Sequence, residues 1–235
     1  MTSFPRYAIY FVPRPDDALY RFGAAMIGYD AFTGTSLPFP NDVVAAVPDW
    51  QALTEDPRKY GFHATLKAPI ALAPERSEAE LVAAVSEFAS QPRHLPVIVP
   101  VARTLSGFTA IVPREPVAAL NKLADDCVTA FDTFRAPMTA QDRARRSPAR
   151  LTARQVAQLD RWGYPYVFDD FRFHMTVTGR LAAGRSDAIV AMIQQRFAKL
   201  GLSELAIDRI GLFRQDDAAS RFAVIGHWSL RSGGG

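Results

Sequence analysis

Apolar and polar residues alternate in several short runs, as in β-strands that bury one face. The runs are rich in β-branched and aromatic residues, which favour strands. The pattern predicts strands at residues 7–12, 61–72, 95–104, 107–112, 171–181, 206–213 and 221–230. Only Leu105 and Ser106 separate the third run from the fourth, so we expect these two strands to form a hairpin.

Helical spacing of apolar residues predicts helices between the strands. Ser77-x-x-Glu80 and Thr152-x-x-Gln155 have the form of capping boxes, which open helices. We expect helices that begin at these boxes, and further helices at residues 16–27, 116–134 and 186–200. Two segments lack such spacing. Residues 28–59 are predicted to be a long excursion with a short helix near Trp50, and residues 135–150 a basic loop.

The order strand, helix, strand, strand occurs twice, in residues 61–112 and 171–230. This repetition predicts an α+β fold with two similar lobes of antiparallel sheet, flanking helices, a pseudo-two-fold axis and a central cleft. We expect residues 1–235 to form a single bilobal domain. Residues 61–112 are the predicted core of lobe 1 and 171–230 the core of lobe 2, with inter-lobe helices and the basic insertion in 115–163.

Composition is that of an ordinary globular chain: 235 residues, of which 49% are hydrophobic and 22% charged. The net charge of +3 is too mild for a dedicated duplex-binding protein. No stretch has the ~20 apolar residues of a membrane span or the build of a signal peptide, so we expect a cytoplasmic protein with no membrane partner. We also expect a monomer. Cys127 is the only cysteine, which excludes an internal disulfide and a thiolate metal cluster, and its apolar spacing indicates burial.

Two of the four histidines lie in matching five-residue settings. The first reads Phe62-His63-Ala64-Thr65-Leu66, and the second reads Phe173-His174-Met175-Thr176-Val177. The other two histidines, at positions 94 and 227, have no threonine two residues on, so structural roles are expected for them. One histidine in a strand is usually structural, but the repetition favours a shared function.

Strand parity assigns faces to these motifs, since residues two apart point the same way. His63, Thr65 and Lys67 share one face of the first strand. In the second strand, the shared face holds His174, Thr176 and, at its end, Arg180. If both faces line one cleft, imidazoles, hydroxyls and cations converge without a carboxylate, a set suited to a phosphate. The spacing fits no metal-ligand template, and we predict no metal and no cofactor.

Three aromatic residues near the motifs are candidates to contact a sugar or a base: Tyr10, Tyr60 and Trp50. Packing in the interior is the commoner fate of such side chains. Both interpretations are left open by the sequence.

The paired motifs resemble those of the 2H phosphoesterase superfamily. More narrowly, the blocks RYAIYFVP, YGFHATLKAP and FRFHMTVTGRL are similar to a family associated with bacterial phosphonate-utilisation operons. The resemblance implies two lobes that flank a cleft and a cyclic phosphodiesterase that needs no metal. It also implies that His63 and His174 are general acid and base, in an order that the sequence leaves open, and that Thr65 and Thr176 hold the phosphate. Parity adds Lys67 and Arg180 to the phosphate ligands.

Three functions remain in competition. The first is a metal-independent cyclic phosphodiesterase for a small sugar or nucleotide, such as the ribosyl 1,2-cyclic phosphate of phosphonate catabolism. The second is an RNA 2′,3′-cyclic phosphodiesterase or RNA-end joining enzyme that binds RNA through the basic segment, which holds Arg143, Arg145, Arg146 and Arg150. The third is a non-catalytic nucleotide-binding module. Two proton-transfer groups argue against the third, since binding alone does not need them.

Overall fold

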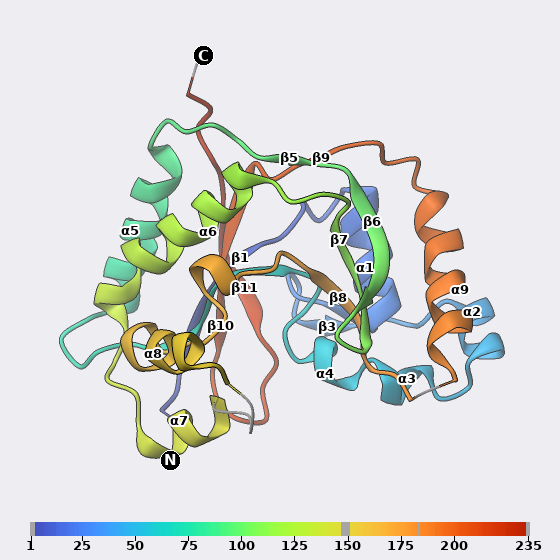
Figure 1. The fold of residues 1–235 in the computed structure, drawn as a ribbon, viewed down its shortest axis with the longest axis horizontal. Helices are drawn as coiled ribbons and strands as arrows, with labels where there is room; N and C mark the ends of the chain where they lie inside the picture. Colours follow the sequence, from blue (N-terminus) through green and yellow to red (C-terminus); the bar gives the residue numbers. More distant parts are fainter. Residues whose placement is uncertain (1–2, 147–150, 183, 234–235) are drawn as a thin grey trace.

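The computed structural model describes residues 3–146, 151–182 and 184–233. One seven-stranded antiparallel sheet has the order β11-β10-β1-β4-β8-β7-β6 (Figure 1). Its strands are β1 Arg6–Phe11, β4 Ala64–Ala71, β6 Pro100–Leu105, β7 Phe108–Pro113, β8 Met175–Arg180, β10 Arg209–Gln215 and β11 Ala223–Ser229. Two short pairs accompany it: β2 Tyr29–Asp30 with β3 Thr35–Ser36, and β5 Val97–Ile98 with β9 Leu205–Ala206. The predicted α+β class with antiparallel sheet is confirmed.

The helices are α1 Ala18–Ile27, α2 Asn41–Ala46, α3 Trp50–Leu53, α4 Glu55–Arg58, α5 Glu78–Ser90, α6 Ala118–Ala130, α7 Ala140–Arg146, α8 Ala153–Trp162 and α9 Ser186–Ala198. Two 3-10 turns, η1 Asp132–Phe134 and η2 Phe168–Asp170, complete the described elements. Both predicted capping boxes are present, at the start of α5 and of α8. The predicted basic loop 135–150 is partly wrong, because its middle forms α7; Arg150 lies outside the described residues.

An internal repeat relates the two halves of the chain. The elements β1-α1-β4-α5-β6 recur in the same order as β7-α6-β8-α9-β10. The counterparts are β1 and β7, β4 and β8, and β6 and β10. If each strand is exchanged with its counterpart, the sheet order β10-β1-β4-β8-β7-β6 is read backwards. The topology therefore has a pseudo-two-fold axis between β4 and β8, and β11 is an addition at one edge.

The predicted assignment of residues 61–112 and 171–230 to separate lobes is wrong. Strands β6 and β7 pair with each other and with β8, whereas β10 pairs with β1 beside β4. The last strand of each repeat thus pairs with the first strand of the other repeat. Between β6 and β7 this pairing uses the expected hairpin, whose turn has positive φ angles at Ser106 and Gly107. The sequence interpretation missed the exchange because it began the repeat one strand too late.

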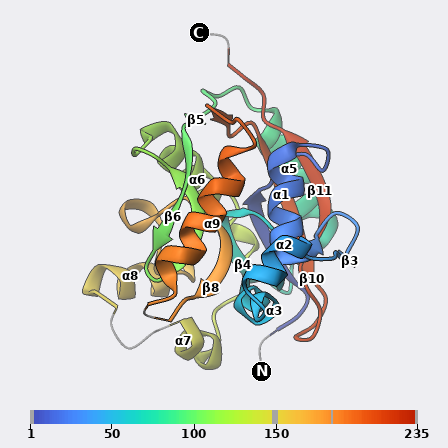
Figure 2. The ribbon, with the colours of Figure 1, turned by 90° about the vertical axis from the view of Figure 1, so that its right-hand side faces the viewer.

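The helices also pack on strands of both repeats. Helix α1 packs on β8 and α6 on β4, while α9 packs on β6 and α5 on β10 and β11. Helices α5 and α6 lie toward one end of the molecule in Figure 1, and Figure 2 shows α1 and α9 side by side on the opposite end. Each half of the sheet is therefore built from both repeats, which ties the two motif strands into one framework.

Candidate functional site

The two motifs meet where β4 and β8 pair in the middle of the sheet. Ala64 pairs with Met175 in antiparallel register, and both side chains are fully buried. Phe62 and Phe173, two residues before them in the two strands, are also buried. Because alternate residues of a strand point to opposite faces, these apolar anchors direct the intervening histidines to the other face.

The histidines and threonines form one cluster on that face. Extending the register by one residue places His63 opposite Thr176 and Thr65 opposite His174. Directly opposite residues of an antiparallel pair project on the same side of the sheet. All four side chains line a single cavity of about 470 Å³. The predicted convergence of the two motifs is confirmed.

Both imidazoles are oriented by a backbone carbonyl two residues earlier. His63 Nδ1 lies 2.9 Å from the Gly61 oxygen, and His174 Nδ1 lies 2.6 Å from the Arg172 oxygen. A carbonyl only accepts hydrogen bonds, so each Nδ1 carries the proton and donates it. In the neutral ring, Nε2 is then left as the proton acceptor. His63 Nε2 lies 3.2 Å from the Thr65 hydroxyl oxygen, which is able to donate to it.

Glycine is required where the chain turns into the first motif. Gly61 has a φ of +78°, and a Cβ there would lie 2.7 Å from the Cβ of Ala31. Any other residue would meet both backbone strain and a clash. The turn aims the Gly61 carbonyl at the His63 ring, so this glycine serves the orientation of the imidazole.

Burial disfavours the charged form of both imidazoles. Desolvation lowers the pKa of His63 from 6.5 to about 4; the charge of His174 adds to this effect and the Gly61 carbonyl opposes it. Desolvation also lowers the pKa of His174, against the effect of the Arg172 carbonyl. Both rings are therefore neutral at pH 7 in the unliganded site. An anion bound between them would favour protonation of one ring.

Different aromatic residues support the two rings. Tyr10 of β1 stacks on His63 with ring centroids 3.7 Å apart, and only 1% of Tyr10 is exposed. Phe108 of β7 lies beside His174 at 5.5 Å in a tilted arrangement. Tyr10 thus packs against the face of the imidazole, and it also lines the first cavity. Trp50 is likewise buried and donates from Nε1 to the Met26 carbonyl, away from the motifs.

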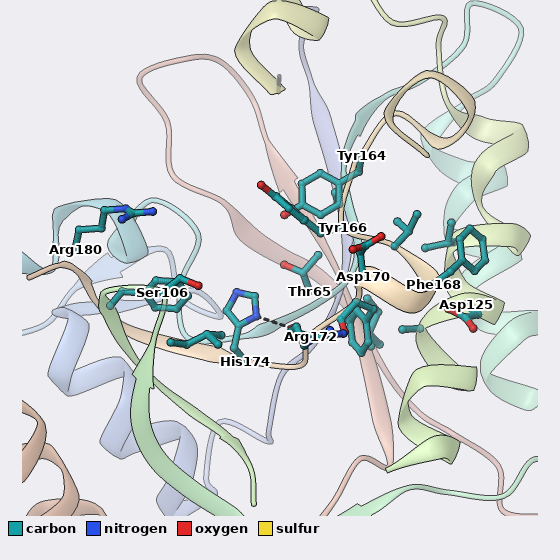
Figure 3. Close-up of a pocket in the computed structure, with 18 residues that line it drawn as sticks. Thr65, Ser106, Asp125, Tyr164, Tyr166, Phe168, Asp170, Arg172, His174 and Arg180 are labelled. Atoms are coloured by element: carbon teal, nitrogen blue, oxygen red, sulfur yellow. Dashed lines mark hydrogen bonds between the residues drawn. The ribbon is translucent and has the colours of Figure 1, made fainter. Parts of the chain in front are cut away.

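A second hollow of about 400 Å³ adjoins the first and shares Thr65 and His174 with it (Figure 3). Tyr164 and Tyr166 line both. In Figure 3, Thr65 and His174 lie near the middle, and the second hollow extends from them toward Phe168 on one side and Arg180 on the other.

The prediction that Lys67 faces the phosphate is wrong. Its side chain is 3% exposed, and its ammonium donates to the Val128 carbonyl and to Asp132 at 2.8 Å. The register between β1 and β4 shifts between the pairs Tyr10↔Thr65 and Ile9↔Lys67, which inserts one extra residue in β4. A bulge of this kind reverses the parity of the residues beyond it. Lys67 therefore points to α6 instead of the cavity.

Two other predicted residues do line the cavities. Arg180 is exposed and lines the second hollow together with His174. Tyr60 lines the first cavity, where its ring stacks on Phe222 at 5.3 Å and lies 6.2 Å from His63. Both remain candidates for contact with a ligand.

Sequence reasoning missed two arginines of the first cavity, Arg6 and Arg146. Arg6 could have been found by parity, because it lies four residues before Tyr10 on the same face of β1. The sequence analysis groups Arg146 with the basic loop 135–150. Helix α7 instead brings it to the cavity wall, where it donates to the Pro69 carbonyl and to the Gly163 carbonyl.

Within residues 3–146, 151–182 and 184–233, no group of three or more His, Cys, Asp or Glu residues is placed to hold a metal ion. Cys127 is buried, and burial raises the pKa of its thiol, as expected of a core cysteine. His227 Nε2 donates to the Val12 carbonyl, 3.0 Å away, outside the motif cluster. None of the helices in the described part of the chain is long and apolar enough to cross a membrane.

A family model described as "Protein of unknown function (DUF1045)" matches residues 65–223. Two curated relatives are both called ribose 1,5-bisphosphate phosphokinase PhnN. The relative from Janthinobacterium sp. (strain Marseille) is 35% identical over 226 residues, and the one from Laribacter hongkongensis (strain HLHK9) is 32% identical over 221 residues. The matches cover 94% and 93% of this chain but only 49% and 50% of the relatives, so the chain spans about half their length.

Solved structures with similar folds include E. coli LigT complexed with ATP, at 14% identity and a TM-score of 0.44, covering 97% of this chain and all of that one. A structure described as a phosphoesterase matches at 13% identity and a TM-score of 0.43, covering 98% of this chain and all of that one.

Proposed function

The chain belongs to the DUF1045 family, whose description assigns no activity, and from the site itself we propose a metal-independent phosphoesterase that opens a cyclic phosphate. In the placement of its two His-x-Thr motifs the protein is 2H phosphoesterase-like. One observation carries the proposal. Two imidazoles, each with Nδ1 fixed on a carbonyl, line one cavity with two threonines and two arginines, and no carboxylate is among the described residues of its wall.

The proposed reaction needs one neutral and one protonated imidazole. The neutral ring accepts a proton at Nε2 from a water molecule, whose oxygen forms a new bond to phosphorus. As the ring P–O bond of the substrate breaks, the protonated ring donates its Nε2 proton to the leaving oxygen. Each positioned acid or base is expected to contribute about 10²- to 10⁴-fold to the rate.

The threonines have a separate role in this proposal. Thr65 and Thr176 donate from their hydroxyls to the non-bridging oxygens, where negative charge grows as water attacks. Arg6 and Arg146 place positive charge in the same cavity. The proton that the base takes up equals the proton that the acid releases, so the pair is restored by exchange with solvent after each turnover.

We propose a small sugar phosphate as the substrate, with ribosyl 1,2-cyclic phosphate of phosphonate catabolism as the leading candidate. The name of the curated relatives supports this choice, since it refers to ribose 1,5-bisphosphate. Hydrolysis of a 1,2-cyclic phosphate at the bond to O2 leaves a phosphate on O1. If O5 already carries a phosphate, the product is ribose 1,5-bisphosphate, the compound in that name.

An RNA substrate is the weaker alternative because one arginine of the basic segment and a nearby arginine of α8 already have acidic partners. Arg143 pairs with Asp160 at 2.8 Å, and Arg154 of the next helix pairs with Asp170 at 2.8 Å. Charges that are already compensated contribute less to phosphate binding. These ion pairs favour a small ligand over a long polyanion.

The experiment that tests the proposal measures phosphomonoester release in the presence of EDTA. The substrates are ribose 1,2-cyclic phosphate, a nucleoside 2′,3′-cyclic phosphate and a short RNA with a 2′,3′-cyclic end. We expect turnover of the sugar phosphate that His63→Ala and His174→Ala each lower by about 10²- to 10⁴-fold. His94→Ala is the matched control, because His94 is exposed and lies outside the cavity.

The outcomes separate the three candidate functions. Preference for the RNA would move the assignment to RNA ends. Binding of cyclic phosphates without turnover, unaffected by either alanine variant, would show that the motif pair is not catalytic. Loss of activity in EDTA that added metal restores would contradict the metal-independent reaction.

A further inference from the structure

Resting on the proposed function, we propose that Arg6 and Arg146 form a second anion site, which binds a phosphate monoester on the same small sugar whose cyclic phosphate the histidines open. The substrate class is thus a doubly phosphorylated sugar. The two arginines come from distant elements, β1 and α7, and line the same cavity as the motif cluster.

The position of Arg6 follows from the regular part of the sheet. Residues 6–10 of β1 pair with β10 without a register shift, so Arg6, Ala8 and Tyr10 point to the same face. Tyr10 stacks on His63 at the motif end of this row. Four residues of strand separate the Cα atoms of Arg6 and Tyr10 by about 13 Å. The long arginine side chain shortens the gap to a span that a pentose with two phosphates can bridge.

Arg6 is held in place by its neighbours. Its Nε donates to the Gln215 side-chain oxygen at 2.9 Å, and its guanidinium lies over the Phe222 ring at 5.5 Å. Gln215 is fixed in turn, because its amide nitrogen donates to the Ser220 carbonyl at 2.7 Å. A preordered guanidinium loses little freedom when it binds a phosphate, and its five N–H donors allow bidentate contact.

Arg146 reaches the same end of the cavity from the other side. Its guanidinium donates to the carbonyl of Pro69 in β4, at the level of β1 near Arg6, and to the Gly163 carbonyl after α8. Both arginines also line an adjoining small hollow, together with Asp142. Both arginines therefore line the first cavity as well as this small hollow.

The positive charges of both arginines act on Tyr10, at the end of the cavity that holds the two motifs. Burial raises the pKa of Tyr10 well above its ordinary value, and the charges of Arg6 and Arg146 act against this rise. The charge of Arg146 acts in the same direction on Tyr164, another lining residue.

The second hollow offers no equivalent site for an anion. It also holds two arginines, Arg172 and Arg180, but Asp125 and Asp170 lie in its wall. Burial raises the pKa of Asp125, and one of its oxygens is buried without a hydrogen-bond partner. A second phosphate is therefore better matched to the part of the first cavity lined by Arg6 and Arg146, whose described lining has no carboxylate; Asp142 lines the adjoining small hollow and not this cavity.

The test compares two substrates that differ only in the second phosphate: ribose 1,2-cyclic phosphate and its 5-phosphate. We expect the wild-type kcat/KM to favour the 5-phosphorylated compound by 10- to 100-fold, as roughly expected for one charge-assisted anion contact. Arg6→Gln and Arg146→Gln are each expected to lower this preference about 10-fold, mainly through KM. Arg6→Lys and Arg146→Lys should retain part of it. Arg21→Gln, on the exposed side of α1, is the matched control and should retain all of it.

A binding measurement separates failure of this proposal from failure of the proposed function. Ribose 5-phosphate is titrated into wild type, His63→Ala, Arg6→Gln and Arg146→Gln. We expect the two glutamine variants to bind about 10-fold more weakly than His63→Ala, whether or not any cyclic phosphate is turned over. Equal binding by all four proteins, or a wild type with no preference for the 5-phosphorylated substrate, would overturn the second anion site.

Discussion

His63 and His174 lie in nearly the same sequence, each directs Nδ1 to the carbonyl two residues earlier, and both line the same cavity, yet their surroundings differ. Thr65 pairs with Tyr10 of β1, and Thr176 pairs with Ala110 of β7, so the internal repeat makes Tyr10 and Ala110 counterparts. A large ring stacks on His63, whereas the counterpart of Tyr10 in β7 is an alanine, which has no ring to stack on His174. The motif strands supply the symmetric pair, and the neighbouring strands make its two members different.

This difference matters for acid and base chemistry, because the two histidines must hold different protonation states during turnover. Identical surroundings would give identical proton affinities. Burial lowers the pKa of His63 to about 4 and also lowers the pKa of His174. The aromatic neighbour of His174, Phe108, is tilted instead of stacked. Changing the neighbours should therefore alter one histidine without the other.

Removing the ring behind His63 should have the largest effect. Tyr10→Ala is expected to lower the free energy of unfolding by about 3–5 kcal/mol, because it leaves a cavity at a fully buried position. It should also raise the pKa of His63 toward 6.5, since water gains access to the ring. Urea unfolding and an NMR titration of the histidines measure these two effects.

The control for this change is Tyr10→Phe, which keeps the ring and removes only the hydroxyl. We expect it to retain most of the stability and the low pKa of His63. If Tyr10→Ala and Tyr10→Phe behaved alike, the stacked ring would not be the source of the asymmetry.

The pH dependence of stability tests the lowered pKa of His63 directly. The folded-state pKa of His63, about 4, lies below its unfolded value of about 6.5. Between these values the unfolded chain binds a proton that the folded chain does not bind. The free energy of unfolding therefore falls as pH decreases from 6.5 to 4, by up to about 3 kcal/mol from this residue. This contribution to stability is fully present above pH 6.5.

Urea unfolding of wild type and His63→Asn at pH 7 and pH 4.5 isolates the contribution, since asparagine does not titrate. We expect the variant to lose about 2–3 kcal/mol less than the wild type over this interval. His174→Asn should also relieve part of the loss, because burial lowers the pKa of His174 as well. Equal acid sensitivity of wild type and His63→Asn would contradict the lowered pKa.

The side chains that share a face within each motif could be predicted from sequence, because this depends only on strand parity next to buried anchors. Phe62, Ala64, Phe173 and Met175 are apolar at alternate positions, and this pattern is local. The pairing of each repeat's last strand with the first strand of the other repeat could not be predicted, because the order of elements along the chain does not determine which strands pair. Arg146 illustrates the same limit: its contact with Pro69 depends on how α7 packs, which no local pattern determines.

Lys67 shows how far along a strand the alternation of faces can be extrapolated from the sequence. It lies only two residues beyond Thr65, but the extra residue in β4 reverses its direction. Bulges depend on pairing with the neighbouring strand, so the sequence of one strand does not reveal them. In the second motif strand the residue at the same distance from its histidine is Thr178, which is buried and accepts a hydrogen bond from the Thr109 backbone. Neither position supplies a cation to the cavity.

Replacement of Lys67 by methionine tests this interpretation and should have the smallest effect. Asp132 would lose a buried partner but keep Arg135 at 2.8 Å and Arg161 at 3.3 Å, so we expect a loss of only about 1–3 kcal/mol in the free energy of unfolding. Turnover of the folded variant should stay within roughly 2-fold of wild type, because Lys67 does not line the cavity. Lys122→Met is the matched control: its ion pair with Asp126 is exposed and worth less than about 1 kcal/mol. A Lys67→Met protein with normal stability and greatly reduced kcat would return Lys67 to the phosphate site and contradict the bulge as the reason for its displacement.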